Sequence, residues 1–158
     1  MPVNIEKYLL TPGPLTTSKL TKEAMLRDVG SWDSDFKKIT SEIREKLVNI
    51  LMQTSNINKI KNSDPYISIP MQGSGTFAVE AMLGTFVPKT NKALVLSNGS
   101  YGKRCSTILN YLGRDNDIID MGDFLPPDPQ LLEEKLEQDP HISHVIVIHC
   151  ETSSGILN

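Results

Sequence analysis

The chain has few of the features that mark secreted, membrane or metal-binding proteins. Its only cysteines, Cys105 and Cys150, lack metal-ligand spacing, so we expect buried free thiols rather than a disulfide or a metal site. No window approaches the roughly 18 consecutive apolar residues that a membrane span needs. The stretch from Met1 to Leu10 has no basic region followed by a long apolar run, so no secretory leader is predicted. We therefore expect a cytoplasmic protein without a membrane partner.

Strong charge of one sign is also missing. The 158 residues include 16 Lys and Arg against 19 Asp and Glu, which gives a net charge of −3. Because the basic residues are scattered rather than clustered, no nucleic-acid surface is predicted. With 39% hydrophobic residues, the length suits one core, either a whole domain or part of one.

Residues 1–65 are predicted to form an N-terminal loop followed by helices. Thr11-Pro12-Gly13-Pro14 indicates a rigid loop, because proline fixes φ and Gly13 permits a positive φ. A short helix is expected from about Ser18 to Arg27. Asp33 and Ser34 are candidate N-caps of a longer helix, and a polar connection is expected from Gln53 to Pro65. The longer helix should lie across a surface, because apolar residues recur in it at helical spacing: Phe36, Ile39, Ile43, Leu47, Ile50 and Leu51.

Residues 66–158 alternate between short apolar strands and helices. This pattern predicts an α/β fold with a mostly parallel sheet covered by helices on both faces. Asp128 is the expected N-cap of the last helix, with Pro129 at its first position. The expected strands are Ile67–Met71, Ala93–Leu96, Ile118–Asp120 and Val145–His149. The expected helices are Thr76–Phe86, Tyr101–Leu112 and a third that runs from Pro129 to Glu137.

Parallel sheets of this kind bind ligands at the carboxyl ends of their strands. Among the loops expected there, Gln72–Thr76 carries the strongest sequence signal for a binding site. It places Gly73-Ser74-Gly75-Thr76 at the start of a helix. The first turn of a helix has unpaired N–H groups and a partial positive charge, while glycine lets a phosphate approach. We therefore predict an anion site, although a tight turn capped by Ser74 or Thr76 would use the same residues. A dinucleotide site is disfavoured because the next strand ends in Ser97-Asn98-Gly99, without an acidic residue.

Two further loops, Ser97–Gly102 and Cys150–Gly155, follow later strands. Tyr101 could stack on a flat ligand, or it could simply open the next helix and pack against it. The run Thr152-Ser153-Ser154 could hydrogen-bond a phenolic or carboxylate oxygen, or it could form a turn. His149 has no paired carboxylate in the sequence, so we expect it to be a packing residue rather than a general base.

Taken together, these motifs resemble the class V aminotransferases, which are fold type I pyridoxal 5′-phosphate (PLP) enzymes, and within them the 2-aminoethylphosphonate–pyruvate transaminases. The resemblance covers nearly the whole chain. It depends on the order and spacing of several short motifs: Leu9-Leu10-Thr11-Pro12-Gly13-Pro14-Leu15-Thr16-Thr17-Ser18, Trp32-Asp33, Gln72-Gly73-Ser74-Gly75-Thr76, Val79-Glu80-Ala81, Ser97-Asn98-Gly99, Tyr101-Gly102, Ile142-Ser143-His144 and Glu151-Thr152 with Gly155.

The resemblance implies roles for particular residues. Ser74, Gly75 and Thr76 would hold the cofactor phosphate, and Tyr101 would stack on the pyridine ring. Thr152 would hydrogen-bond near the phenolic oxygen of the cofactor. The segment formed by Thr11, Pro12, Gly13 and Pro14 would border the substrate pocket. The implied reaction moves the amino group of 2-aminoethylphosphonate to pyruvate, giving phosphonoacetaldehyde and alanine, and the family members are homodimers.

In that family, the lysine that forms the Schiff base and the aspartate that pairs with the pyridinium nitrogen would lie beyond Asn158. We therefore expect no catalytic residue in residues 1–158, an N-terminal portion of the PLP-binding large domain over 66–158, and no activity from this part alone. The strand Ile67–Met71 would lose its neighbours while the other three stay together, which predicts marginal stability and association. The alternatives are a fragment of an alanine–glyoxylate or serine–pyruvate type enzyme, and a noncatalytic module that binds a phosphate ligand.

Overall fold

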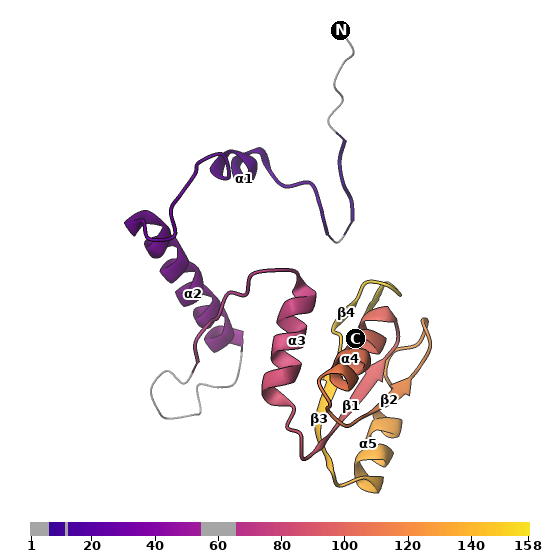
Figure 1. The fold of residues 1–158 in the computed structure, drawn as a ribbon. Helices are drawn as coiled ribbons and strands as arrows, with labels where there is room; N and C mark the ends of the chain where they lie inside the picture. The colour runs from indigo at the N-terminus through magenta and orange to yellow at the C-terminus, as the bar shows by residue number, and fades with distance from the viewer. Residues whose placement is uncertain (1–6, 12, 55–65) are drawn as a thin grey trace. The chain divides into compact units, whose positions relative to one another are not determined.

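The computed structural model describes residues 7–11, 13–54 and 66–158. The chain divides into two compact units, Met1–Pro70 and Met71–Asn158. Figure 1 shows the helices of the first unit and the sheet with its helices in the second.

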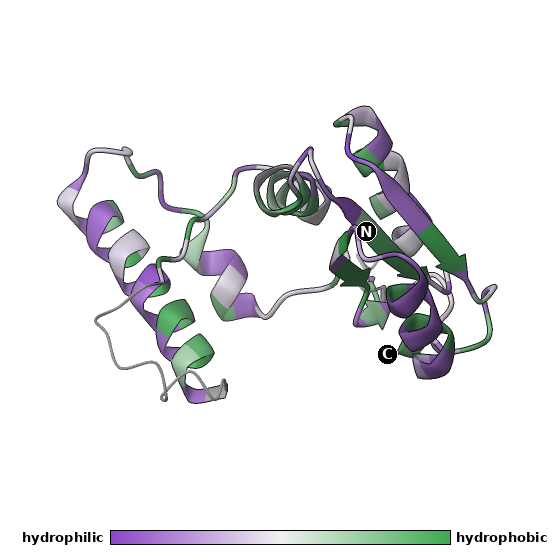
Figure 2. Ribbon diagram, turned by 90° about the horizontal axis from the view of Figure 1, so that it is seen from below, coloured by the Kyte–Doolittle hydropathy of each residue, from purple (hydrophilic) through white to green (hydrophobic). Residues whose placement is uncertain are grey.

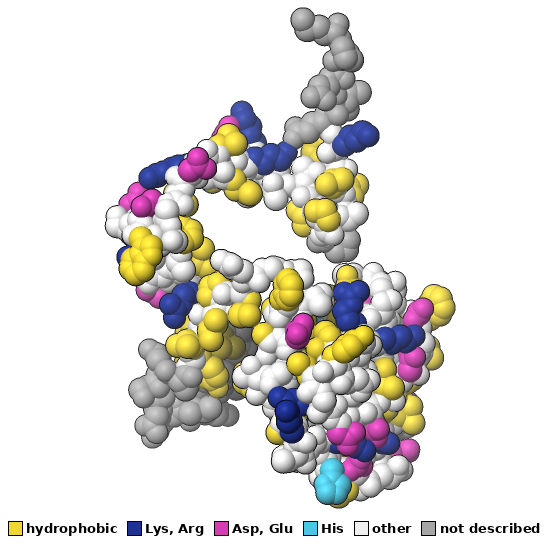
Figure 3. Space-filling view, viewed as in Figure 1, with side chains coloured by type: hydrophobic (Ala, Val, Ile, Leu, Met, Phe, Trp, Pro, Cys, Tyr) yellow, Lys and Arg dark blue, Asp and Glu magenta, His cyan; other side chains and the backbone are white. Residues whose placement is uncertain are grey.

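The first unit contains the two predicted helices. Helix α1 spans Lys19–Ala24, and the Ser18 side chain caps it by accepting a hydrogen bond from the Thr21 N–H. Helix α2 spans Ser34–Thr54, so Gln53 and Thr54 extend the helix rather than open the polar connection. The remainder of that expected connection, residues 55–65, lies outside the described residues. The apolar residues of α2 recur as predicted and are substantially exposed (Figure 3).

The N-terminal loop of the first unit forms a small turn. Leu10 and Leu15 make an antiparallel bridge, and the Thr11 hydroxyl donates to the Pro14 carbonyl. Gly13 does not use the positive φ that the sequence allowed it, since among the described residues that conformation occurs only at other glycines. A residue that precedes proline is driven toward extended backbone, which explains the difference. Pro12 lies outside the described residues.

The second unit is built on a three-stranded parallel sheet. Strand β1 (Lys92–Ser97) lies at the centre, between β2 (Asn116–Asp120) and β3 (Ile142–Val147), so the order is β2-β1-β3. Val95 is aligned with Ile118 on one side and with Ile146 on the other. The central strand is the most buried, as expected when both faces of a parallel sheet are covered. The predicted α/β fold class is confirmed.

Three helices accompany the sheet: α3 (Gly75–Phe86), α4 (Ser100–Tyr111) and α5 (Pro129–Gln138). The connection through α4 runs from β1 to β2, and the connection through α5 runs back past β1 to β3. Because such crossovers are right-handed, the reversal of direction places α4 and α5 on opposite faces, as Figure 2 shows. Asp128 caps α5 as predicted, accepting from the Gln130 N–H at 2.8 Å.

The core lies between the sheet and the pair α3 and α4. It consists of buried apolar side chains from each element: Leu83, Val87, Ala93, Val95, Cys105, Leu109 and Ile146. Burial raises the pKa of the Cys105 thiol, with a smaller contribution from the Glu151 charge. Cys105 is therefore the buried thiol that the sequence predicted. Cys150 is exposed, which corrects that prediction for the second cysteine.

One strand prediction was wrong, and another was right in place but not in its bounds. The segment Ile67–Met71 forms no strand, because no described strand pairs with it to receive its N–H and C=O groups. The last predicted strand, Val145–His149, ends at Val147 and begins earlier, at Ile142. It is followed by an unexpected hairpin of β4 (Cys150–Glu151) and β5 (Ile156–Leu157). Among the described residues, the helices are all too short or too polar to cross a membrane.

Candidate active site

The three loops predicted to form the site meet at the carboxyl edge of the parallel sheet. Strand β1 ends at Ser97 and leads into α4, while the chain after β3 returns along the same edge. The two loops contact each other directly, because the Ser100 N–H donates to the Ser153 hydroxyl at 2.8 Å. Helix α3 begins beside them, with the Thr76 hydroxyl 3.4 Å from a guanidinium nitrogen of Arg104 on α4. The start of α3, the start of α4 and the loop after β3 therefore lie near one another, although no described strand precedes the first of them.

The N-terminus of α3 is open. Ser74 is the N-cap residue, but its side chain makes no capping hydrogen bond, in contrast to the side chains of Ser18 and Asp128. Within the described residues, the N–H groups of Gly75 and Thr76 donate to no protein acceptor, and a Cβ added at Gly75 would meet nothing within 4 Å. Unpaired N–H groups, a helix dipole and free space are what an anion requires.

Gly73 makes the turn into α3 possible. Its φ is +122°, a conformation that side chains disfavour. A Cβ at this position would also lie 2.0 Å from the ring of Phe77. A glycine is therefore needed here for the backbone to enter the helix.

The N-terminus of α4 is closed from within the chain. Glu151 has an exposed fraction of 0%, and its carboxylate accepts from the N–H groups of Gly102 at 3.0 Å and Tyr101 at 3.4 Å. The Ser153 hydroxyl donates to the same carboxylate at 2.5 Å. Desolvation alone would raise the pKa of Glu151, but the hydrogen bonds from Ser153, Gly102 and Tyr101 outweigh it and lower the pKa. Glu151 is therefore an anion that satisfies this helix terminus.

Tyr101 lies at the first turn of α4 with 40% of its surface exposed. The guanidinium carbon of Arg104 lies 5.1 Å from the centroid of the Tyr101 ring, within the range of a cation–π contact. The ring is thus neither buried in the core nor fully solvated. Arg104 connects the ring with Thr76, and it was not among the residues predicted for the site.

The loop after β3 presents Thr152 to solvent. Thr152 is exposed, and within the described residues its hydroxyl forms no hydrogen bond, whereas the neighbouring Ser153 is bonded to Glu151. His149 is exposed and not packed, which corrects the sequence interpretation. Its Nδ1 lies 2.7 Å from the Asn158 carbonyl oxygen, across the β4–β5 hairpin. Among the described residues no carboxylate pairs with His149, so the structure does not support a role as a general base.

A pair of amide side chains, the buried Asn98 and the partly exposed Asn158, supports the same edge of the sheet. The Asn98 side chain donates to Asn158 Oδ1 at 2.8 Å, and the Asn158 side chain donates back to Asn98 Oδ1 at 3.1 Å. Asn98 also donates to the Leu125 carbonyl, and Asn158 to the Ile148 carbonyl. These bonds connect the chain after β1 with the chain after β3, and the sequence offered no local sign of them because the two residues are 60 positions apart.

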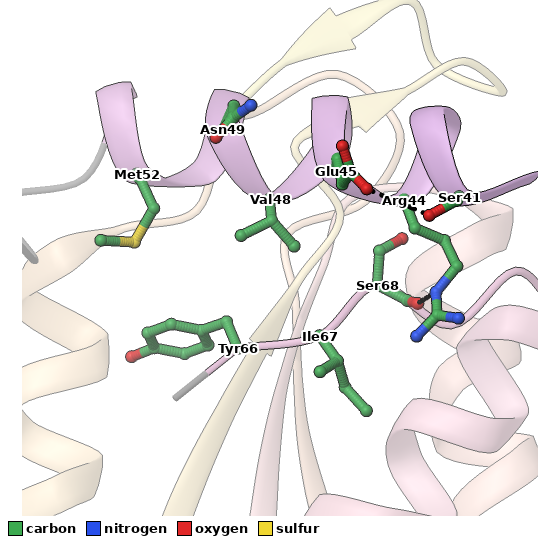
Figure 4. Close-up of a pocket in the computed structure, with 9 residues that line it drawn as sticks. All are labelled: Ser41, Arg44, Glu45, Val48, Asn49, Met52, Tyr66, Ile67 and Ser68. Atoms are coloured by element: carbon green, nitrogen blue, oxygen red, sulfur yellow. Dashed lines mark hydrogen bonds between the residues drawn. The ribbon is translucent and has the colours of Figure 1, made fainter. Parts of the chain in front are cut away.

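The segment Thr11–Pro14 belongs to the first unit, which is described separately from the sheet. Its role at a substrate pocket stays a prediction. The first unit also contains a cavity between α2 and residues 66–68, lined by Arg44, Glu45 and Tyr66 among others (Figure 4). The Arg44 side chain there donates to the Ser68 carbonyl at 3.0 Å. This cavity faces the middle of a helix, where backbone N–H groups are already paired, so it lacks the anion-binding groups found at α3.

Comparison with known proteins places this geometry in context. No family model matches the chain. The chain is 54% identical over 153 residues to 2-aminoethylphosphonate–pyruvate transaminase 1 of Paraburkholderia xenovorans, covering 97% of the chain and 37% of that protein. It is also 54% identical to the 2-aminoethylphosphonate–pyruvate transaminase of Rhizobium meliloti, covering 97% of the chain and 38% of that protein. The chain therefore spans less than two fifths of the length of these relatives.

Solved structures agree with the fold. An alanine–glyoxylate aminotransferase from Nostoc matches 99% of the chain and 39% of its own length, with a TM-score of 0.75 and 25% identity. An aspartate aminotransferase from Thermus thermophilus matches 96% of the chain with a TM-score of 0.77 and 22% identity. The resemblance seen in the motifs is confirmed: over nearly its whole length the chain is homologous to 2-aminoethylphosphonate–pyruvate transaminases, and it has a fold found in class V aminotransferases.

Proposed function

We propose that the chain is the part of a 2-aminoethylphosphonate–pyruvate transaminase that binds the phosphate and the ring of PLP. The observation that carries this proposal is the open N-terminus of α3, which lies beside the cation of Arg104. Arg104 in turn contacts the Tyr101 ring, and Glu151 connects the backbone of Tyr101 with the loop that contains Thr152. When bound, the cofactor supplies an electron sink for amino-group transfer. The residues of this chain bind and orient it.

The residues present fit a phosphorylated cofactor. Two helices begin at the same edge of the sheet, and the internal carboxylate of Glu151 already occupies the N-terminus of α4. A phosphate is therefore directed to α3, where Ser74, Gly75 and Thr76 offer N–H and O–H donors. Arg104 adds a positive charge next to Thr76.

The ring would be held between the two later loops. Tyr101 offers a half-exposed aromatic face, and an aromatic side chain in this state can stack on a pyridine ring. Thr152 offers a hydroxyl that is not engaged in the described structure, suited to donate to the phenolic oxygen of the cofactor. Thr11, Pro12, Gly13 and Pro14 would border the substrate, by family resemblance.

In this proposal, the amino donor is the one named for the relatives that are 54% identical to the chain. The identity of 54% to transaminases of 2-aminoethylphosphonate exceeds the 25% to the alanine–glyoxylate enzyme, which shares the fold. The proposed substrates are therefore 2-aminoethylphosphonate and pyruvate, with phosphonoacetaldehyde and alanine as products. A homodimer is proposed by the same resemblance.

The test is a titration of the ¹⁵N-labelled chain with pyridoxamine 5′-phosphate, which has the ring and the phosphate but cannot condense with surface lysines. The amide resonances of Ser74, Gly75, Thr76, Tyr101 and Thr152 should move together. Inorganic phosphate should move only those at the start of α3. The amide of Lys92, at the opposite end of β1, serves as the internal reference. Site resonances that stay fixed at saturating ligand would overturn the proposal.

A further inference from the structure

The buried carboxylate of Glu151 connects the two loops that are proposed to hold the cofactor ring. Residue 151 directly precedes Thr152, and its side chain accepts the N–H of Tyr101 at 3.4 Å and that of Gly102 at 3.0 Å. The partners lie about fifty positions apart in the sequence. A single side chain thus fixes the backbone of Tyr101 relative to the backbone of Thr152.

Gly99 makes room for this carboxylate, which is fully buried. A Cβ added at Gly99 would lie 2.5 Å from Glu151 Cγ and 2.6 Å from its Cδ. A Cβ at Gly102 would lie 2.9 Å from the Cα of Ser97, so α4 also approaches the end of β1 closely. Because the side chain is enclosed and held by several donors, it has little freedom to leave.

Ser153 completes the connection. Its hydroxyl donates to Glu151 at 2.5 Å and accepts from the Ser100 N–H at 2.8 Å. Its own N–H also lies 3.4 Å from the carboxylate. Residues on both sides of Thr152 are therefore bonded to the first turn of α4, while the Thr152 side chain is left pointing to solvent.

We propose that Glu151 is a positioning residue for the cofactor ring: it holds Tyr101 and Thr152 at a fixed separation without touching the ligand itself. The inference rests on the proposed function. It divides the site into two parts, a phosphate part at α3 that does not depend on Glu151 and a ring part that does.

A second consequence concerns the phosphate. With its N–H groups bonded to Glu151, the N-terminus of α4 cannot accept an external anion, so the phosphate is left with α3 alone. The hydrogen bonds that lower the pKa of Glu151 keep it charged at neutral pH, with its ordinary value being 4.5. Glu151 therefore remains a carboxylate, able to accept these hydrogen bonds, at neutral pH.

The test compares the affinities of two ligands in Glu151→Gln. Glutamine fills the same space but replaces one acceptor oxygen with an NH₂ group, which cannot accept from the α4 backbone. We expect pyridoxamine 5′-phosphate to bind about tenfold more weakly, as when a charged acceptor is lost, and inorganic phosphate to bind with unchanged affinity. Glu137→Gln, an exposed substitution on α5, is the matched control and should change neither affinity.

Each outcome is decisive. Equal affinity of Glu151→Gln and the unchanged chain for pyridoxamine 5′-phosphate would overturn the inference while leaving the proposed function intact. Failure of the unchanged chain to bind either ligand would overturn the proposed function and the inference with it. A loss of both affinities in Glu151→Gln would indicate a general structural role and contradict positioning. If Glu151→Gln does not fold, Ser153→Ala removes one donor to the carboxylate and should weaken only pyridoxamine 5′-phosphate, by about threefold.

Discussion

The N-termini of α3 and α4 are built from nearly the same residue types. They differ in which group, if any, accepts hydrogen bonds from their first backbone N–H groups. One reads Gly73-Ser74-Gly75-Thr76 and the other Gly99-Ser100-Tyr101-Gly102. Both place a serine among glycines at the first turn of a helix, at the same edge of the unit. The first leaves its N–H groups open, whereas the second binds them to the buried Glu151.

This difference shows that a glycine-hydroxyl turn does not define a ligand site by itself. At α4 the anion comes from the protein, so the turn is structural and its neighbour Tyr101 is held in place. At α3 no described side chain supplies the anion, so the same local design is available to a ligand. The distinction depends on a residue about fifty positions away, which explains why the two turns look alike in the sequence.

The largest expected effect is on the closed turn. In Gly99→Ala, the new methyl group would lie 2.5 Å from Glu151 Cγ, and neither the backbone nor the buried carboxylate can yield easily. The φ of Gly99 is 174°, which any residue can adopt, so the cost is steric alone. We expect a loss of about 2 kcal/mol in the free energy of unfolding, measured by urea denaturation. A change below about 0.5 kcal/mol would show that Glu151 is not enclosed as described.

Acid should weaken the closed turn as well. The folded chain lowers the pKa of Glu151 below its ordinary 4.5, so its carboxylate stabilises the fold above that pH. This stabilisation is lost as the pH falls through the lowered folded pKa. We expect the unchanged chain to exceed Glu151→Gln in unfolding free energy by about 1 to 3 kcal/mol at pH 7.

The comparison should be made by thermal or urea unfolding at several pH values, with Gly102 amide shifts followed in parallel. Because both proteins share their other carboxylates, the contributions of Asp117 and Asp139 cancel in the difference. The difference should stay constant from pH 7 to about 5 and shrink in more acidic solution. A difference that does not depend on pH below 4.5 would mean that the Glu151 charge has no role in the closed turn.

At the open turn, an added methyl group should affect ligand binding and not stability, the reverse of its effect at the closed turn. Gly75→Ala places a methyl group in free space, so we expect a change of at most about 0.5 kcal/mol in stability. The same methyl group would obstruct the approach of a phosphate to the first turn, weakening inorganic phosphate about tenfold. Isothermal titration calorimetry measures the affinity. Gly84→Ala, near the C-terminal end of α3, is the control and should leave the affinity unchanged. If Gly75→Ala bound phosphate as tightly as the unchanged chain, the proposal that the anion binds at the N-terminus of α3 would be wrong.

The features of the fold that depend on a few neighbouring residues were predicted from the sequence. The cap of the last helix was found at Asp128, the first helix was placed at about Ser18, and the three strands of the parallel sheet were found with shifted ends. Apolar alternation and capping chemistry act over a few residues, so they can be recognised from the sequence. The strand expected at Ile67–Met71 was wrong because an apolar run becomes a strand only beside a partner.

The candidate site was predictable only in part. Ser74, Gly75, Thr76 and Tyr101 stand in recognisable turns, but nothing near Glu151 marks it as buried. It stands in a run of hydroxyl residues that favours an exposed loop, and its partners are on α4. A carboxylate at a strand end, followed by a hydroxyl run, could have been considered as a partner for a neighbouring helix start. Arg104 was not predicted as a site residue for a similar reason, because its contact with Thr76 joins two helices that are separate in the sequence.

The smallest expected effect separates two neighbouring cations of α4. Lys103 is paired with Asp120 at 3.2 Å and with Asp123 at 3.7 Å, so its charge is largely neutralised. Arg104 lies instead against Tyr101 and Thr76 at the open turn. We expect Arg104→Gln to weaken inorganic phosphate about threefold at low ionic strength and Lys103→Gln to have no measurable effect. At about 1 M salt, where charges are screened within about 3 Å, the difference should vanish. If Arg104→Gln and Lys103→Gln lost the same affinity for phosphate, the anion would respond only to the net charge of the helix. Arg104 would then have no specific role at the open turn.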